Sequence, residues 1–189
     1  MFLFPLAFSP GPGNMFFATM SARFGFAATL RANAGYHLAT LAVTLLIGLG
    51  LISVLEPGSA IFAALKMAGG FYVLWLAFKL ARAGTTGENA AAKQAGFADG
   101  AMLLVLNPKA YVIIFLMFTQ FADAGPRDLH MRVLVITLLF TLNNLVAFSL
   151  WALAGDALGR LFRSETAAWW LNLAFATVLT GVGLWMLLG

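Results

Sequence analysis

The sequence Asn107-Pro108-Lys109 lies in the middle of a long hydrophobic stretch, and it limits what the chain can fold into. Proline lacks the N–H that an α-helix needs in its interior, so it kinks or breaks a helix. Within the hydrocarbon of a membrane, open backbone and a lysine charge are tolerated only where protein or trapped water surrounds them. This segment is therefore expected to face an internal cavity.

A second helix-breaking cluster, Pro10-Gly11-Pro12-Gly13-Asn14, interrupts the first hydrophobic stretch. The prolines and glycines are expected to unwind the chain, with a helix opening at Met15 and Asn14 serving as its cap. The exposed amides and the positive end of that helix favour an anionic group such as a carboxylate. The alternative is a structural kink whose backbone groups are satisfied by neighbouring helices.

The composition indicates an all-α integral membrane protein. Of the 189 residues, 62% are hydrophobic and 10% are charged, with a mean hydropathy of +0.93, whereas soluble domains carry about 25% charged residues. The net charge of +4 fits basic loops that face anionic lipid better than it fits nucleic-acid binding. Because the chain has no cysteine, thiol catalysis, disulfides and cysteine-based metal sites are excluded.

Six stretches are long enough to cross a bilayer, which needs about 20 apolar residues per helix. They cover approximately residues 1–22, 34–55, 61–80, 97–121, 133–153 and 168–188. The whole chain, 1–189, is predicted to form one transmembrane domain, with half-repeats of about 1–82 and 95–189 joined by a polar linker over about 83–94. Residues 1–18 lack a basic start and are broken by prolines, so we expect them to be retained rather than cleaved as a signal peptide.

Each half holds three predicted spans, so the halves are expected to enter the membrane in opposite directions as a 3+3 inverted-topology repeat. The breaks in spans one and four then face each other at the midplane, where such repeats bind their solute. Most lysines and arginines outside the spans lie in the loops that join spans one to two, three to four and five to six. The positive-inside rule places those loops in the cytoplasm and both termini outside.

Lys109 has two predicted roles. A lysine at the centre of a span costs about 2.5–3.5 kcal/mol, so it is expected to bind a carboxylate, or to lose its proton when desolvated. A purely structural pairing, or snorkelling to the interface, is the alternative. Pro108 also leaves the carbonyl near position 104 without its helical partner, and that carbonyl is predicted to bind a polar solute or water.

Polar side chains occur in two further spans. Thr137, Thr141 and Asn144 share one helix face, and they either line a polar path or hydrogen-bond to neighbouring helices. His37 lies on a stripe with Thr40 that is expected to pack against a neighbour. A role for His37 in proton coupling is the alternative, because histidine titrates near neutral pH.

Carboxylates occur only near the span ends. Asp99 and Asp156 are expected to be solvated there, and Asp99 is the acid that we would test first for proton coupling. Because no carboxylate lies deep in a span, neither a metal site nor another cofactor is predicted. Close helix contacts are predicted at Gly69-Gly70 and at Gly181 with Gly183. Small residues on several helix faces are compatible with a homodimer.

Several motifs occur together along nearly the whole chain. They are Ser9-Pro-Gly-Pro-Gly-Asn14, Leu65-Lys-Met-Ala-Gly-Gly-Phe-Tyr72, and Phe97-Ala-Asp-Gly100 leading into Leu106-Asn-Pro-Lys-Ala110. On these motifs the chain resembles the LysE/RhtB-type amino-acid exporters, the lysine exporter and homoserine–threonine exporter family. The paired Pro-Gly-Pro and Asn-Pro-Lys motifs are specific in combination.

The resemblance implies six spans in the bacterial inner membrane and export of amino acids or related small metabolites. It also implies that an ion gradient drives export, by proton antiport, and that Pro10, Pro12, Asn14, Asn107, Pro108 and Lys109 line the translocation site. It does not identify the substrate, because the Pro-Gly-Pro-Gly-Asn form is a subtype feature.

We therefore predict an alternating-access exporter of small amino acids or similar zwitterions. The break at Gly13 and Asn14 would hold the substrate carboxylate, Lys109 would be a second anion partner or a proton-responsive switch, and Asn107 and Asn144 would offer polar contacts. The proton-coupling candidates are Lys109, His37 and Asp99. The alternatives are an exporter of another solute or of a metal cation, a structural subunit, and a membrane-embedded enzyme, which would need a nucleophile–base or acid–base constellation.

Overall fold

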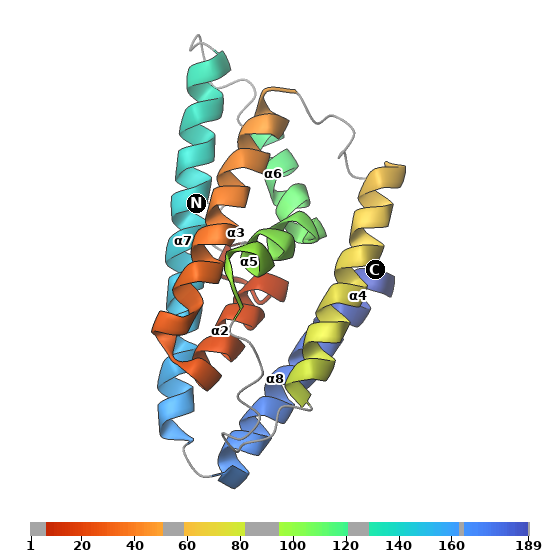
Figure 1. Ribbon diagram of the computed structural model, residues 1–189. Coiled ribbons are helices and arrows are strands. Elements are labelled where there is room, and N and C mark those ends of the chain that lie inside the picture. The colour runs from red at the N-terminus through yellow and green to blue at the C-terminus, as the bar shows by residue number, and fades with distance from the viewer. Residues whose placement is uncertain (1–6, 51–58, 82–94, 121–128, 163–164, 189) are drawn as a thin grey trace.

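The computed structural model describes residues 7–50, 59–81, 95–120, 129–162 and 165–188, which contain helices and no strands. The predicted linker over 83–94 lies outside the described residues. The helices, labelled in Figure 1, are α2 (Pro12–Phe24), α3 (Phe26–Gly48), α4 (Ala60–Ala81), α5 (Phe97–Val105), α6 (Pro108–Gln120), α7 (Leu129–Leu161) and α8 (Glu165–Leu188).

The helices agree with a multi-pass membrane protein. Three of them, α4, α7 and α8, are each long and apolar enough to cross a bilayer, and α5 with α6 forms a fourth span if the bent pair counts as one. The predicted break in the stretch 97–121 is confirmed, since α5 and α6 meet at an angle of 62°. The arrangement of six spans in two inverted halves remains a prediction.

Helices α3 and α7 begin at least four residues earlier than the hydropathy predicts. The span predicted over 34–55 belongs to α3, which already starts at Phe26, and the span predicted over 133–153 belongs to α7, which runs from Leu129 to Leu161. Hydropathy marks the part of a helix that suits hydrocarbon, whereas the helix itself continues through polar residues such as Arg31 until the backbone turns. The turn before α3 is made by Gly25, at a φ of 82°.

The helices form two groups (Figure 1). Helices α4 and α8 lie side by side as a pair, while α2, α3, α5, α6 and α7 gather around the two chain breaks. Met15 and Ala18 of α2 join the groups, because they belong to one hydrophobic cluster with Phe175 and Leu179 of α8. The breaks therefore lie inside the larger group and are covered on one side by the pair.

Glycines allow α2 and α7 to touch through their backbones. A Cβ atom added to Gly155 of α7 would lie 2.0 Å from the carbonyl oxygen of Ala18 in α2, and one added to Gly159 would lie 2.0 Å from that of Ala22. Contacts between small residues of this kind are a main source of helix association in membranes, where lipid is as apolar as the protein.

The same arrangement joins α3 to α5. A Cβ on Gly35 would lie 1.9 Å from the carbonyl oxygen of Phe97, and one on Gly100 would lie 1.8 Å from that of Ala32. Sequence reasoning did not single out either pair of glycines, because a glycine in a span does not reveal which helix approaches it. These contacts set the position of α5, and therefore of the break that follows it.

Of the glycine contacts predicted from sequence, three are confirmed and one is wrong. Gly69 of α4 faces the carbonyl of Leu106, 1.8 Å from an added Cβ, and Gly70 faces Gly183 of α8 across the helix pair. Gly181 has no atom within 4 Å of an added Cβ. Its face of α8 is exposed, turned away from the other described helices.

We predict that Gly155→Ala lowers the thermal stability of the detergent-purified protein, whereas Gly181→Ala does not. The added methyl group at Gly155 must displace backbone rather than a flexible side chain, and overpacking of this kind costs about 1–3 kcal/mol. At Gly181 the methyl group meets open space and improves helix propensity. Thermal unfolding of the two variants beside the unmodified protein tests this, and equal stability of both would contradict the backbone contact.

Candidate functional site

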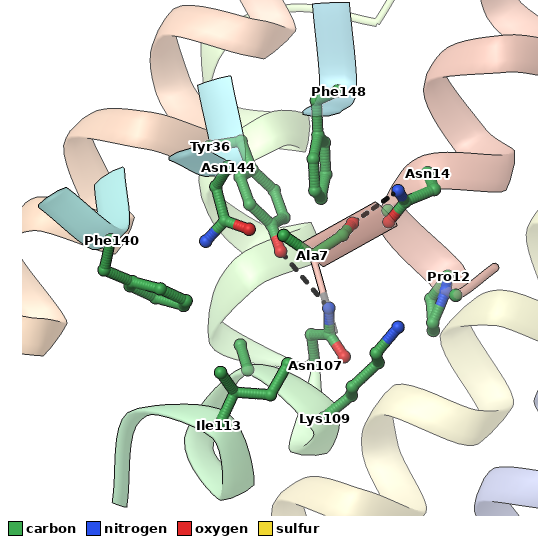
Figure 2. A pocket seen from close by; sticks show the side chains of 13 residues that line it. Ala7, Pro12, Asn14, Tyr36, Asn107, Lys109, Ile113, Phe140, Asn144 and Phe148 are labelled. Carbon is green, nitrogen blue, oxygen red and sulfur yellow. Dashed lines mark hydrogen bonds between the residues drawn. The ribbon is translucent and has the colours of Figure 1, made fainter. Parts of the chain in front are cut away.

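The two chain breaks meet at one cavity, as Figure 2 shows. The volume open to the centre of a water-sized sphere is about 20 Å³, so in this conformation the cavity is nearly filled by its own side chains. Its lining comes from the first break and α2, from Tyr36 of α3, from the second break and α6, and from three residues of α7. The lining residues are Ala7, Gly11, Pro12, Gly13, Asn14, Tyr36, Asn107, Lys109, Ala110, Ile113, Phe140, Asn144 and Phe148.

Six of the eight predicted substrate-binding residues line this cavity: Pro12, Gly13, Asn14, Asn107, Lys109 and Asn144. Pro10 and Pro108 do not, although the carbonyl oxygen of Pro10 lies 3.5 Å from the Lys109 Nζ atom. Pro10 and Pro108 therefore lie next to lining residues in the sequence, and they affect the cavity through the backbone conformation that they impose. The structure thus groups residues that are about one hundred positions apart in the sequence.

Lys109 connects the two breaks. Its Nζ atom donates to the Ser9 hydroxyl at 2.8 Å and to the Ser9 carbonyl at 3.0 Å, and none of its contacts among the described residues is a carboxylate. Gly11 makes room for it, because a Cβ there would lie 3.0 Å from Nζ. The lysine charge is thus held by neutral oxygens alone, which leaves it available to an anionic ligand.

The carbonyls of the helical residues Ala7 and Phe8, and of Ser9 at the start of the first break, accept hydrogen bonds from side chains of α2, α6 and α7. The Ala7 carbonyl accepts from the Asn14 amide at 2.9 Å, and the Phe8 carbonyl accepts from the Trp151 indole N–H at 3.1 Å. With Lys109 bound to Ser9, the successive carbonyls of residues 7–9 all have donors. Open backbone survives in hydrocarbon only when it is satisfied in this way.

The prediction that Asn14 caps a helix starting at Met15 is wrong. Helix α2 begins at Pro12 with Gly11 as its cap, and no side chain caps it. Proline is favoured in the first turn, where its missing N–H is not needed. Asn14 therefore lies inside the first turn, and its side chain binds the carbonyl of Ala7.

The second break is also closed by its own residues. The Leu104 carbonyl, predicted to lose its partner to Pro108 and to be available to solute, accepts the Asn107 backbone N–H at 2.9 Å. The Val105 carbonyl accepts from the Tyr111 hydroxyl at 2.8 Å. Asn107 donates to the Tyr36 hydroxyl at 3.3 Å, while its buried Oδ1 has no hydrogen-bond partner among the described residues.

The electrostatics of the cavity favour an anionic group. The N-termini of α2 and α6 both lie at the cavity, since Gly11 to Asn14 contribute to its wall from α2, and Asn107, Lys109 and Ala110 contribute from the start of α6. A helix N-terminus carries partial positive charge and unpaired N–H groups, and Lys109 adds a full charge. No Asp or Glu lines the cavity, so nothing in its wall balances this positive potential.

An aromatic wall closes the remaining side. The ring of Tyr36 lies 4.6 Å from that of Phe148, centroid to centroid, and Phe17 makes edge contacts with both. A Cβ on Gly13 would lie 2.5 Å from the Phe148 ring, so glycine is required where α2 meets this wall. Sequence reasoning missed Ser9, Tyr36 and Phe148 as site residues, although Tyr36 could have been found as a polar ring beside His37.

The other polar residues predicted in spans lie elsewhere. Of the Thr137, Thr141 and Asn144 face, only Asn144 lines this cavity. Asp99 is exposed, and its carboxylate accepts the Gly96 N–H at 2.7 Å, which caps α5 and places it away from the cavity. The prediction that Asp156 is solvated is wrong. It is 8% exposed and pairs with Arg160 one turn later, since the turn at Gly25 lies over it.

Comparisons with known proteins identify the family of the chain. Residues 4–189 match the family model described as LysE type translocator. A cysteine/O-acetylserine efflux protein of Salmonella choleraesuis is 32% identical over 159 residues, covering 83% of this chain and 80% of the relative. The Escherichia coli K12 protein of the same name is 30% identical over 178 residues, covering 92% and 87%.

An uncharacterised membrane protein of Pseudomonas aeruginosa is 31% identical over 164 residues, covering 82% of this chain and 76% of the relative. No solved structure matches the chain. The family model spans nearly the whole chain, including both breaks and the cavity that they form. The protein therefore belongs to the LysE type translocator family, and it is a transporter rather than an enzyme.

Proposed function

We propose that this protein exports small neutral amino acids, or related zwitterionic metabolites, across the bacterial inner membrane, with a proton moving in the opposite direction. One observation carries the proposal: the Lys109 Nζ atom and the Asn107 Oδ1 atom belong to the same cavity, and among the described residues the first is held only by neutral oxygens and the second has no partner. A zwitterion offers a carboxylate to the first group and an ammonium to the second.

In the proposed complex the substrate carboxylate lies between Lys109 and the start of α2. The N–H groups of Gly13 and Asn14 are in the first turn, where no acceptor exists within the helix. The substrate ammonium donates to Asn107 Oδ1, which needs a donor because a buried acceptor without one costs about 1–3 kcal/mol. Asn144 and the aromatic wall contact the remainder of the molecule.

The same binding mode offers a reason for movement. A carboxylate at Lys109 competes with Ser9 for the Nζ protons, and the bonds to Ser9 join the first break to the second. Substrate binding would therefore loosen the connection between the two predicted halves, which then rock about the site by alternating access. The positive-inside count supports termini on the periplasmic side.

The composition of the cavity supports a neutral substrate side chain. Lysine and arginine would bring a second cation beside Lys109 without a carboxylate in the wall to bind it. The relatives named for cysteine and O-acetylserine efflux support the same class of substrate. The described residues hold no group of three or more His, Cys, Asp or Glu side chains that could hold a metal ion.

We predict that Lys109→Met reduces export at least about ten-fold without blocking insertion, as expected when a hydrogen bond to a charged group worth about 1.5–3 kcal/mol is lost. Lys66→Met is the matched control, because Lys66 is another helical lysine but does not line the cavity. Efflux from preloaded cells, normalised to membrane protein, measures both variants. Unchanged export by well-inserted Lys109→Met protein would refute the assigned site.

We also predict selectivity among amino acids. In inverted vesicles, O-acetylserine, cysteine and similar small neutral amino acids should be transported, lysine and arginine should not, and a proton uncoupler should stop accumulation. The measurement is uptake of labelled substrates in vesicles with and without the protein. Preferential transport of lysine would contradict the binding mode, and uncoupler-resistant accumulation would contradict proton exchange.

A further inference from the structure

His37 lies between the proposed substrate site and a second hollow. Its side chain is buried, at 6% exposure, and its ring contacts those of Tyr36 and Phe148, with centroids 5.3 Å and 5.5 Å away. Both of these rings line the substrate cavity. His37 itself lines a separate groove between α3 and α7, whose wall also includes Asn33, Thr141 and Ser149.

The two ring nitrogens of His37 differ. Nδ1 lies 2.8 Å from the carbonyl oxygen of Asn33, one turn earlier in α3. A carbonyl can only accept, so Nδ1 carries the proton in the neutral ring and Nε2 is an acceptor. Nε2 is buried and has no hydrogen-bond partner in the part of the chain that the structure describes. The imidazole also faces the backbone of Asn144 in α7, whose carbonyl is a second acceptor.

A second proton changes what this ring can do. The neutral ring has one N–H group and can donate a hydrogen bond to only one of the two carbonyls. An imidazolium has two N–H groups and can donate to both. Protonated His37 would therefore bind Asn33 on α3 and Asn144 on α7 together. Because the Asn144 side chain lines the substrate cavity, such a bond acts on the wall of the site.

We propose that His37 carries the exchanged proton and works as a clasp, which joins α3 to α7 when protonated and releases α7 when neutral. This inference rests on the proposed function of the adjacent site. A zwitterionic substrate has no net charge, so it does not repel the proton on His37 directly. Proton binding and substrate binding are instead linked through the position of α7 in the cavity wall. Drawing Asn144 toward α3 removes it from the substrate, so proton and substrate bind alternately, as antiport requires.

No charged side chain on the helices around His37 takes the place of the two carbonyls as partner of its imidazolium. Along residues 12–22 of α2 and 133–155 of α7 the sequence has no ionisable side chain. Helix α5 contributes Asp99, which is exposed and bound to Gly96, and α6 contributes Lys109 and Tyr111. Tyr36 and Arg31 are the ionisable neighbours on α3 itself. No carboxylate on these helices is placed to hold the imidazolium permanently.

The first test separates proton coupling from substrate movement in proteoliposomes. His37→Gln keeps a hydrogen-bonding side chain that does not titrate. We expect it to retain substrate-for-substrate exchange but to lose accumulation driven by a pH gradient by about ten-fold, within the usual range of coupling between sites. The control is His130→Gln, which changes the other histidine, exposed at the start of α7, and should affect neither activity. Full gradient-driven accumulation by His37→Gln would overturn the proposal.

The second test does not depend on transport or on the folding of a His37 variant. In His130→Gln protein His37 is the only histidine, so nitrogen-15 NMR reports its ring alone. We expect the ring to gain a proton as the pH is lowered while the protein remains folded, with a midpoint that moves to lower pH when O-acetylserine is added, since linkage is reciprocal. A ring that stays neutral throughout would overturn the clasp.

These outcomes distinguish the two proposals. If the unmodified protein transports no amino acid, the proposed function fails, while the NMR titration without substrate still supports or refutes protonation of His37. If the unmodified protein transports amino acids and His37→Gln matches it under a pH gradient, the function stands and the clasp fails.

Discussion

The hydrogen bonds from the Lys109 Nζ atom to Ser9 are the interaction on which the rest of the site depends. They join two stretches of unwound backbone that could not exist separately in hydrocarbon, because each exposes polar groups that lipid cannot satisfy. The first break supplies the neutral oxygens of Ser9, and the second supplies the charged Lys109 side chain that they bind. Neither stretch is complete without the other, which explains why the breaks lie together.

Backbone contacts at glycine bring these stretches into position. Gly155 and Gly159 hold α2 against α7, and Gly35 and Gly100 hold α5 against α3. Each break is thus attached on one side to a helix that continues straight through the molecule. At each of these contacts a carbonyl group occupies the space that a side chain would need, so the two helices approach at backbone distance.

Much of the site could be predicted from residue types alone. A proline beside a lysine in an apolar stretch has few acceptable environments, so an internal polar cavity was expected at Asn107 to Lys109, and the second break pointed to its partner. The local geometry was harder. Helix α2 starts at Pro12 rather than Met15, and the Leu104 carbonyl finds the Asn107 N–H, since neighbouring donors adjust within one turn at little cost.

The sequence by itself determined that the chain is helical, that it belongs in a membrane, and that two breaks and one buried lysine need protein around them. Those properties follow from local chemistry: hydropathy, the missing N–H of proline and the cost of a charge in hydrocarbon. Only the tertiary structure decided that Lys109 binds Ser9. It also decided that Tyr36 and Phe148 form one wall of the cavity and that His37 lies behind this wall. These pairings join residues far apart in the sequence, and they depend on which helix faces approach one another, which no local pattern specifies.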